Sequence, residues 1–212
     1  MSDLTPQHIE YTNLKPDVTH LDIDALVATA KERSFYGVCV PPFWVKRARR
    51  EIGTANLQLV TVTGYPVGYQ MTETKEAEIK SAIALGADEV DMVLNVSAVK
   101  SGMSWVKIEM ARCAKLAHAH ERLLKVILET SLLTEDEIRQ VTRWAVDAGV
   151  DYIKTSTGMV GEGAKVSDVA LIKSVIPDGV GIKASGGIRS ADQAAELIKA
   201  GAEKIGTSSI LI

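Results

Sequence analysis

A short pattern occurs three times in the chain, in residues 84–94 (ALGADEVDMVL), 147–157 (DAGVDYIKTST) and 199–209 (KAGAEKIGTSS). In each copy a helical stretch ends at a glycine, and a small or β-branched residue and an acid then lead into a strand. Gly86, Gly149 and Gly201 have the place of the left-handed residue that ends a helix. Repeated helix-to-strand connections of this kind predict βα units whose parallel strands are buried on both faces.

Eight short apolar runs alternate with stretches of helical spacing along the 212 residues. We predict strands over residues 9–12, 37–40, 58–63, 89–94, 124–129, 152–155, 180–184 and 204–206. Capping-box spacing predicts helix starts at Thr134 with Glu137 and at Ser190 with Gln193. The pattern favours one α/β domain over residues 1–212, folded as a (β/α)8 or TIM barrel. A doubly wound open sheet is the alternative, but no GxGxxG motif follows an early strand.

Only a few residues follow the last predicted strand before Ile212. We therefore expect the eighth helix of the barrel to be short or missing. Such a gap would leave apolar surface in contact with water. A homo-oligomer, either a dimer or a tetramer, is expected to cover it.

The formal net charge is −3 and the basic residues are scattered, which is not typical of a nucleic-acid-binding protein. No apolar run approaches the roughly 20 residues of a membrane helix, and the N-terminus lacks the layout of a signal peptide. Cys39 and Cys113 are the only cysteines, too few for a disulfide framework. We therefore expect a cytoplasmic protein that binds neither membranes nor nucleic acids.

Four charged residues interrupt the apolar runs of predicted strands: Asp91, Lys125, Lys154 and Lys183. Counting five residues from each glycine of the repeated pattern lands on Asp91, Lys154 and Gly206, so the first two have equivalent depth in their strands. In a barrel they would point inward near the C-terminal mouth, where this fold builds its active sites. A buried ion-pair network without a catalytic role is the alternative, but one acid and three lysines together favour a functional site.

Burial and a neighbouring ammonium both disfavour the charged form of a lysine. Lowering the pKa of a lysine by about 3 units requires about 4 kcal/mol, which these two effects can supply. A lysine neutralised in this way can attack a carbonyl and form a Schiff base. Lys154 has only a modest advantage over Lys183 as the nucleophile. Asp91 could move protons, and Lys125 could keep Asp91 ionised.

Glycine-rich turns follow the last two predicted strands, Gly186-Gly187 after the seventh and residues 206–209 (GTSS) after the eighth. Their backbone N–H groups predict a phosphate-binding site at the position where barrel enzymes often have one. The hydroxyls between Thr155 and Thr157 could orient substrate and water. Cys39, at the end of the second strand, is expected to be a small buried thiol, with contact to the substrate as a second role. We expect no cofactor and no catalytic metal, because HExxH and CxxC motifs are absent.

At these residues the sequence closely resembles the deoxyribose-phosphate aldolase family, whose members are class I aldolases on a (β/α)8 barrel. The resemblance extends from Asn13 to Ser209. It is most specific in residues 89–95 (EVDMVLN), 125–130 (KVILET), 152–158 (YIKTSTG), 183–189 (KASGGIR) and 206–209 (GTSS).

The resemblance implies a role for each charged residue. Lys154 would form the Schiff base, Lys183 would lower its pKa, Asp91 would transfer protons and Lys125 would support Asp91. The substrate phosphate would be held around Gly158, Gly186, Gly187, Ser208 and Ser209. The implied reaction is the reversible cleavage of 2-deoxy-D-ribose 5-phosphate to D-glyceraldehyde 3-phosphate and acetaldehyde.

The chain departs from the family pattern on the first strand, where Glu10-Tyr11-Thr12 stands in place of Asp-His-Thr. It also has Met159 where some members have a lysine, so one phosphate contact is expected to be missing. Two other interpretations are an isomerase or decarboxylase of a sugar phosphate, which would not need a covalent lysine, and a phosphosugar-binding barrel without catalysis.

Overall fold

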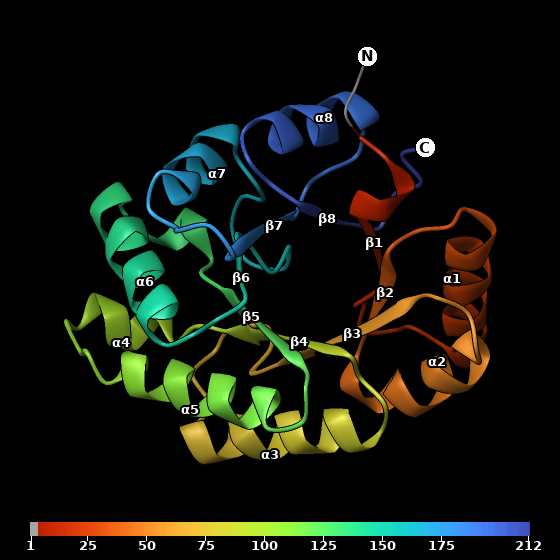
Figure 1. The fold of residues 1–212 in the computed structure, drawn as a ribbon, viewed down its shortest axis with the longest axis horizontal. Helices are drawn as coiled ribbons and strands as arrows, with labels where there is room; N and C mark the ends of the chain where they lie inside the picture. The colour runs from red at the N-terminus through yellow and green to blue at the C-terminus, as the bar shows by residue number, and fades with distance from the viewer. Residues whose placement is uncertain (1–3) are drawn as a thin grey trace.

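The computed structural model describes residues 4–212 and contains a closed barrel of eight parallel strands. Neighbours in the barrel are neighbours in the chain, and the first strand closes the barrel against the eighth (Figure 1). The predicted barrel is therefore confirmed. The strands are β1 (Ile9–Thr12), β2 (Gly37–Val40), β3 (Gln58–Thr63), β4 (Glu89–Val93), β5 (Leu123–Ile127), β6 (Tyr152–Lys154), β7 (Gly181–Ser185) and β8 (Lys204–Thr207).

The first three strands match the predicted ranges, and the other five differ by one or two residues at an end. The differences arise because burial does not stop where strand pairing stops. Leu94 and Leu128 follow β4 and β5, and both are fully buried although neither belongs to a strand. An apolar run therefore marks the buried segment rather than the last paired residue.

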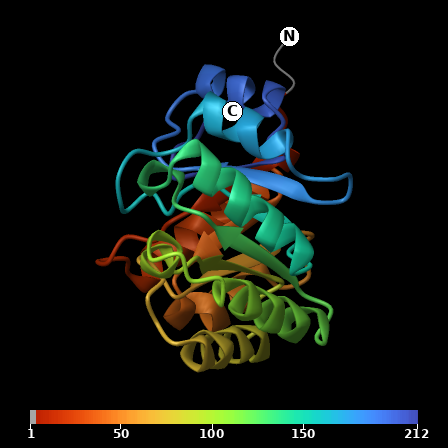
Figure 2. The ribbon, with the colours of Figure 1, turned by 90° about the vertical axis from the view of Figure 1, so that its left-hand side faces the viewer.

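Helices form a ring around the outside of the barrel (Figure 1), and Figure 2 shows the green and teal helices lying across the strands. The α-helices are α1 (His20–Glu32), α2 (Val45–Ile52), α3 (Thr72–Ala84), α4 (Val96–Lys100), α5 (Val106–His118), α6 (Glu135–Asp147), α7 (Val166–Lys173) and α8 (Ala191–Lys199). Short 3-10 helices are η1 (Pro6–His8), η2 (Pro42–Trp44) and η3 (Thr130–Leu132). None of the helices described is both long enough and apolar enough to cross a membrane.

The connection between β4 and β5 contains two α-helices, and α8 lies between β7 and β8. Residues 208–212, which follow β8, contain no helix. Within this segment Leu211 packs against the core, while 51% of Ile210 and 37% of Ile212 are exposed.

The local signals that end and begin helices act as predicted, except that the predicted capping box at Ser190 is only half formed. The three glycines of the repeated pattern have positive φ angles of 104°, 78° and 116° at Gly86, Gly149 and Gly201. Thr134 and Glu137 form a reciprocal capping box at the start of α6. Ser190 caps α8 by accepting from the N–H of Gln193, whose own side chain accepts from the N–H of Arg189 instead of closing the box.

Alternation along each strand separates the outer core from the barrel interior. Val90, Ile153 and Ile182 belong to the apolar cluster that includes the helices, and all three are fully buried. The residues that follow them, Asp91, Lys154 and Lys183, therefore point to the other face of the sheet. The strand register places Lys154 opposite Lys183 and Asp91 opposite Lys125.

Candidate active site

Six charged side chains meet inside the barrel, three acids and three lysines. Their side chains are at most 3% exposed. They come from β1, β4, β5, β6 and β7 and are Glu10, Glu89, Asp91, Lys125, Lys154 and Lys183. Because buried charges are costly unless they are paired, equal numbers of both signs make this interior possible.

Asp91 lies at the centre of the cluster. Its Oδ2 atom accepts from Lys154 Nζ at 2.8 Å and from Lys183 Nζ at 2.7 Å. Its Oδ1 atom accepts from Lys125 Nζ at 3.0 Å. The structure therefore brings together all four charged residues that the sequence singled out.

The electrostatics differ for each member of this group. Burial lowers the pKa of Lys154 below its ordinary value, and the charge of Lys183 lowers it further against the attraction of Asp91. Burial also opposes the charge on Lys183, but Asp91 and Glu10 outweigh it and raise its pKa. Burial likewise disfavours the Asp91 carboxylate, yet Lys125, Lys154 and Lys183 hold its pKa well below the usual range. The arrangement thus places a lysine with a lowered pKa beside one with a raised pKa.

Glu10 and Glu89 are the two members of the cluster that the sequence analysis did not single out, and Glu10 is the one that contacts Lys183. It forms an ion pair with Lys183, and its Oε1 atom lies 3.4 Å from Lys125 Nζ. Burial opposes its charge, but these two lysines lower its pKa. The available signal was the same one that marked Asp91, an acid inside the short apolar run of a strand.

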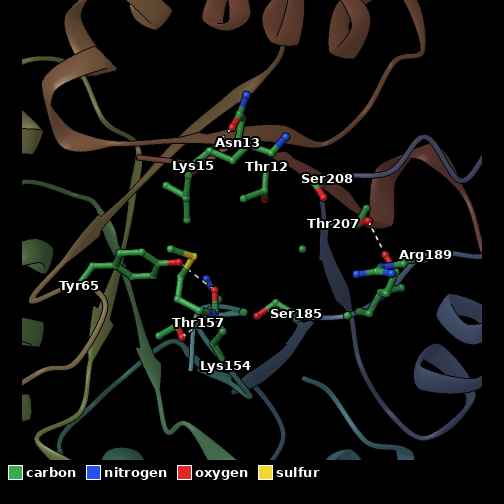
Figure 3. Close-up of a pocket in the computed structure, with 17 residues that line it drawn as sticks. Thr12, Asn13, Lys15, Tyr65, Lys154, Thr157, Ser185, Arg189, Thr207 and Ser208 are labelled. Carbon is green, nitrogen blue, oxygen red and sulfur yellow. Dashed lines mark hydrogen bonds between the residues drawn. The ribbon is translucent and has the colours of Figure 1, made fainter. Parts of the chain in front are cut away.

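A pocket with a volume of about 240 Å³ opens at the C-terminal end of the barrel. Figure 3 shows Lys154 and Thr157 on one side of it and Lys15 and Arg189 elsewhere on its rim. The lining residues are Thr12, Asn13, Leu14, Lys15, Tyr65, Lys154, Thr157, Gly158, Met159, Ser185, Gly186, Gly187, Ile188, Arg189, Gly206, Thr207 and Ser208. Six of the residues predicted for the site line this pocket: Lys154, Thr157, Gly158, Gly186, Gly187 and Ser208.

Two predicted contacts lie outside the lining. Cys39 is fully buried beside Val60 and Val62, and burial raises the pKa of its thiol to about 11. Ser209 follows the last lining residue, and its backbone N–H donates to Thr207 Oγ1 at 3.0 Å. Contact of either side chain with a substrate remains a prediction.

Glycines allow the loops after β6 and β7 to come close together. Gly158, Gly186 and Gly187 have φ angles of 78°, 92° and 72°, which favour glycine. A Cβ atom on Gly163 would lie 2.0 Å from the carbonyl oxygen of Gly186. A side chain at residue 163 would therefore push the two loops apart.

Comparison with known proteins identifies the family of this chain. Residues 3–210 match the model of the DeoC/LacD family of aldolases. The chain belongs to this family. Deoxyribose-phosphate aldolase from Brevibacillus brevis is 48% identical over 204 residues, which cover 96% of this chain and 91% of that relative.

Solved structures support the assignment of this chain to the DeoC/LacD family of aldolases. A putative deoxyribose-phosphate aldolase from Coccidioides immitis has a TM-score of 0.92 and 38% identity, covering 96% of this chain and 81% of that one. The deoxyribose phosphate aldolase from Aeropyrum pernix, described as a unique tetrameric structure, has a TM-score of 0.88 and 32% identity. That match covers 95% of this chain and 85% of the Aeropyrum chain.

Loop residues that the sequence analysis missed line the aldolase pocket or contact its lining. Tyr65 lines it, and its hydroxyl donates to the carbonyl oxygen of Thr157 at 2.9 Å. Glu129, which has a left-handed φ of 57°, accepts from both the backbone N–H and the hydroxyl of Thr157. Lys15 and Arg189 add positive charge to the rim. No periodic pattern marks such residues, because loops place them and only the closed barrel brings the loops together.

Proposed function

We propose that this protein is a deoxyribose-phosphate aldolase that reversibly cleaves 2-deoxy-D-ribose 5-phosphate to D-glyceraldehyde 3-phosphate and acetaldehyde through a Schiff base on Lys154. The observation that carries the proposal is a buried lysine with a lowered pKa at the base of the pocket, 2.8 Å from a carboxylate and beside a second lysine. The near-full-length similarity to proteins named deoxyribose-phosphate aldolase supports the same activity.

In the direction of synthesis, the neutral amine of Lys154 attacks the carbonyl carbon of acetaldehyde, and loss of water gives an iminium ion. Asp91, directly or through a water, removes a proton from the neighbouring carbon to form an enamine. The enamine carbon then attacks the aldehyde carbon of D-glyceraldehyde 3-phosphate, whose oxygen takes up a proton. Hydrolysis of the new iminium ion releases the product and restores Lys154.

The other two lysines remain charged in this scheme. Lys183 keeps its proton because Asp91 and Glu10 overcome the effect of burial, and its positive charge favours the neutral form of Lys154. Lys125 donates to the other oxygen of Asp91 and favours its ionised form. Asp91 is therefore ionised and can accept a proton once the iminium ion has formed.

The phosphate group is proposed to lie among the glycines at the other side of the pocket. Gly158, Gly186 and Gly187 leave their backbones accessible there, and Thr157 and Ser208 add hydroxyls. The end of β8 is tied to the loop after β7, because the hydroxyl of Thr207 donates to the carbonyl oxygen of Ile188 at 2.8 Å. Backbone N–H groups and the cationic rim suit a phosphate dianion.

Trapping of the covalent adduct tests the proposal. The protein is incubated with acetaldehyde or 2-deoxy-D-ribose 5-phosphate and reduced with borohydride, and the modified peptide is identified by mass spectrometry. The expected adduct lies on Lys154 and is lost in Lys154→Met. Lys204→Met is a matched control, because burial also lowers the pKa of Lys204 but this residue lies outside the pocket lining.

Binding of the phosphosugar without an adduct would contradict the covalent mechanism. Turnover of another sugar phosphate in that case would point to an isomerase or decarboxylase, and binding without turnover would point to a phosphosugar-binding protein.

The flank of the barrel after β8 is proposed to be covered by a second copy of this chain. Residues 208–212 leave Ile210 and Ile212 partly exposed, and the Aeropyrum relative is described as tetrameric. Light scattering at micromolar concentration should therefore give the mass of a dimer or tetramer. A monomer under these conditions would contradict the proposal.

The protein is also proposed to act in the cytoplasm. Its two cysteines, Cys39 and Cys113, are both buried free thiols, which suits a reducing compartment. Fractionation of the native cells with an antibody against the chain tests this proposal. Recovery in a compartment other than the cytosol would contradict it.

A further inference from the structure

Glu89 belongs to the buried charge cluster but lies far from the pocket opening along its strand. It is the first residue of β4, at the N-terminal end of the barrel, and only 2% of it is exposed. Asp91 follows two residues later, so both side chains point into the barrel and are separated by about 7 Å along the strand. The pocket lining does not include Glu89. Its negative charge is buried at the end of the barrel where no substrate is proposed to bind.

The two oxygens of Glu89 have different partners. Oε1 accepts a hydrogen bond from the hydroxyl of Tyr36, which precedes β2 and is half-buried. Oε2 forms an ion pair with Lys125 Nζ. Glu89 is thus held between a tyrosine near the barrel end and a lysine in its centre.

Lys125 connects Glu89 to the proposed reaction. Besides Glu89, its ammonium lies 3.0 Å from Asp91 Oδ1 and 3.4 Å from Glu10 Oε1. Three carboxylates therefore share one ammonium, and the position of Lys125 depends on all of them. Loss of the Glu89 carboxylate would leave Lys125 paired only with Asp91 and Glu10.

We propose that Glu89, anchored by Tyr36, is a positioning residue for the aldol reaction, which holds Lys125 below Asp91 and tunes the charge around Asp91 and Lys154. This inference rests on the proposed function, because it concerns the acid and base groups of that reaction. Glu89 acts through Lys125 and does not touch the substrate.

The linked side chains of Tyr36, Glu89, Lys125 and Asp91 keep fixed protonation states and do not form a proton path. Burial opposes the charge of Lys125, but Asp91, Glu10 and Glu89 raise its pKa well above the ordinary value. Burial and the charge of Glu89 raise the pKa of Tyr36 as well. Both groups keep their protons during turnover, so neither can pass one on.

Several elements contribute charged or titratable groups near Glu89, and Lys125 is the member that bridges it to Asp91. Lys204 Nζ lies 3.2 Å from the centre of the Tyr36 ring and donates to the carbonyl oxygen of Gln7 at 3.1 Å. The groups that face Glu89 are Tyr36, Lys125 from β5, Glu10 from β1, Lys204 from β8 and Tyr152 from β6.

The sign of the effect follows from the charge balance. Glu89→Gln leaves three buried lysines facing two carboxylates, so the cluster becomes more positive. A more positive surrounding favours neutral Lys154, and the acidic limb of the pH–rate profile should move down by about 0.5 to 1 pH unit. The same surrounding makes Asp91 a weaker base, so kcat should fall about tenfold with little change in KM.

The test compares Glu89→Gln with Glu89→Asp, which keeps the charge, and with Glu203→Gln as a matched control. Glu203 also accepts from a tyrosine near this end of the barrel, Tyr152 at 3.4 Å, but it is exposed. For each variant, kcat, KM and the rate of reductive trapping of acetaldehyde on Lys154 are measured against pH. We expect Glu89→Gln to shift both profiles, Glu89→Asp to restore them at least in part, and Glu203→Gln to leave them in place.

Equal loss of activity at every pH in Glu89→Gln, with no shift of the trapping profile, would overturn the inference and leave Glu89 a structural role only. If Glu89→Gln does not fold, Tyr36→Phe provides the test, because it frees Glu89 to move toward solvent. The shift should then have the same direction and a smaller size, and an unchanged profile would overturn the inference. Absence of a trapped adduct in the unsubstituted protein would contradict the proposed function instead, so the two failures are distinguishable.

Discussion

Lys154 and Lys183 donate to the same oxygen atom, Asp91 Oδ2, at 2.8 Å and 2.7 Å, yet their pKa values are shifted in opposite directions. Both lysines are buried and lie opposite each other on β6 and β7. The difference is a second carboxylate, because Glu10 pairs with Lys183. Within residues 4–212, Asp91 is the one carboxylate at ion-pair distance from Lys154.

Lys183→Leu should move the acidic limb of the activity profile to higher pH by about one unit. Removal of the neighbouring positive charge raises the pKa of Lys154, so a larger fraction of this lysine is protonated and unreactive at neutral pH. The pH dependence of kcat/KM measures the shift. The double variant Lys183→Leu with Glu10→Gln restores equal numbers of buried charges, and its profile should return part of the way. An unchanged profile in Lys183→Leu would remove this lysine from the tuning role.

Gly163→Ala should weaken binding of the phosphorylated acceptor more than tenfold. The added Cβ would lie 2.0 Å from the carbonyl oxygen of Gly186, so the loop that contains Gly186 and Gly187 must move. The measurement is KM for D-glyceraldehyde 3-phosphate, and D-glyceraldehyde is the matched acceptor without phosphate. Equal losses with both acceptors would argue against a phosphate site between these loops.

The ion pair between Lys75 of α3 and Glu109 of α5 should contribute to stability and not to activity. Both side chains are fully buried, with 2.8 Å between Lys75 Nζ and Glu109 Oε1, and they lie among the helices outside the barrel. Lys75→Met leaves an uncompensated buried carboxylate and should lower the free energy of unfolding by about 3–5 kcal/mol.

Urea unfolding measures this loss, and the double variant Lys75→Met with Glu109→Met should recover most of it, because two apolar side chains leave no unpaired charge. Additive losses in the double variant would show that packing, rather than the pairing of charges, determines the effect. The kcat of the folded protein is expected to stay the same in both variants.

Cys39 and Cys113 should react very slowly with iodoacetamide in the native protein. Burial raises their thiol pKa values to about 11 and about 12, so the reactive thiolate is scarce at neutral pH. Mass spectrometry after timed exposure gives the modified fraction. The same exposure in denaturing urea should modify both residues rapidly, and rapid labelling of Cys39 without urea would show that the barrel interior opens.

Much of the fold could be predicted from local patterns. The glycines at residues 86, 149 and 201 end helices because only glycine adopts the required φ without strain, and this requirement is visible in the sequence. The strands are recognisable because buried parallel strands require continuous apolar runs. Asp91, Lys125, Lys154 and Lys183 were identifiable because charges interrupt these runs, and the repeated pattern predicts that Asp91 and Lys154 lie at equivalent depth near the mouth of the barrel.

The contacts between the loops around the pocket were not predictable in the same way. Tyr65 and Thr157 are joined by a hydrogen bond across 92 residues of chain, and neither has a neighbour in the sequence that signals the other. Their contact depends on the curvature of the closed barrel, which places the loop after β3 beside the loop after β6. Local propensity contains no information about that distance.

The sequence by itself determined that the chain forms a barrel of βα units and that one acid and three lysines enter its interior, because both results depend on short-range periodicity and burial. It did not determine which lysine has the lowered pKa. That was decided by tertiary structure, since Glu10 lies on β1, 173 residues from Lys183, and reaches it only when β1 closes against β8. The closed barrel gives Lys183 a second carboxylate, so the pKa of Lys183 is raised while that of Lys154 is lowered.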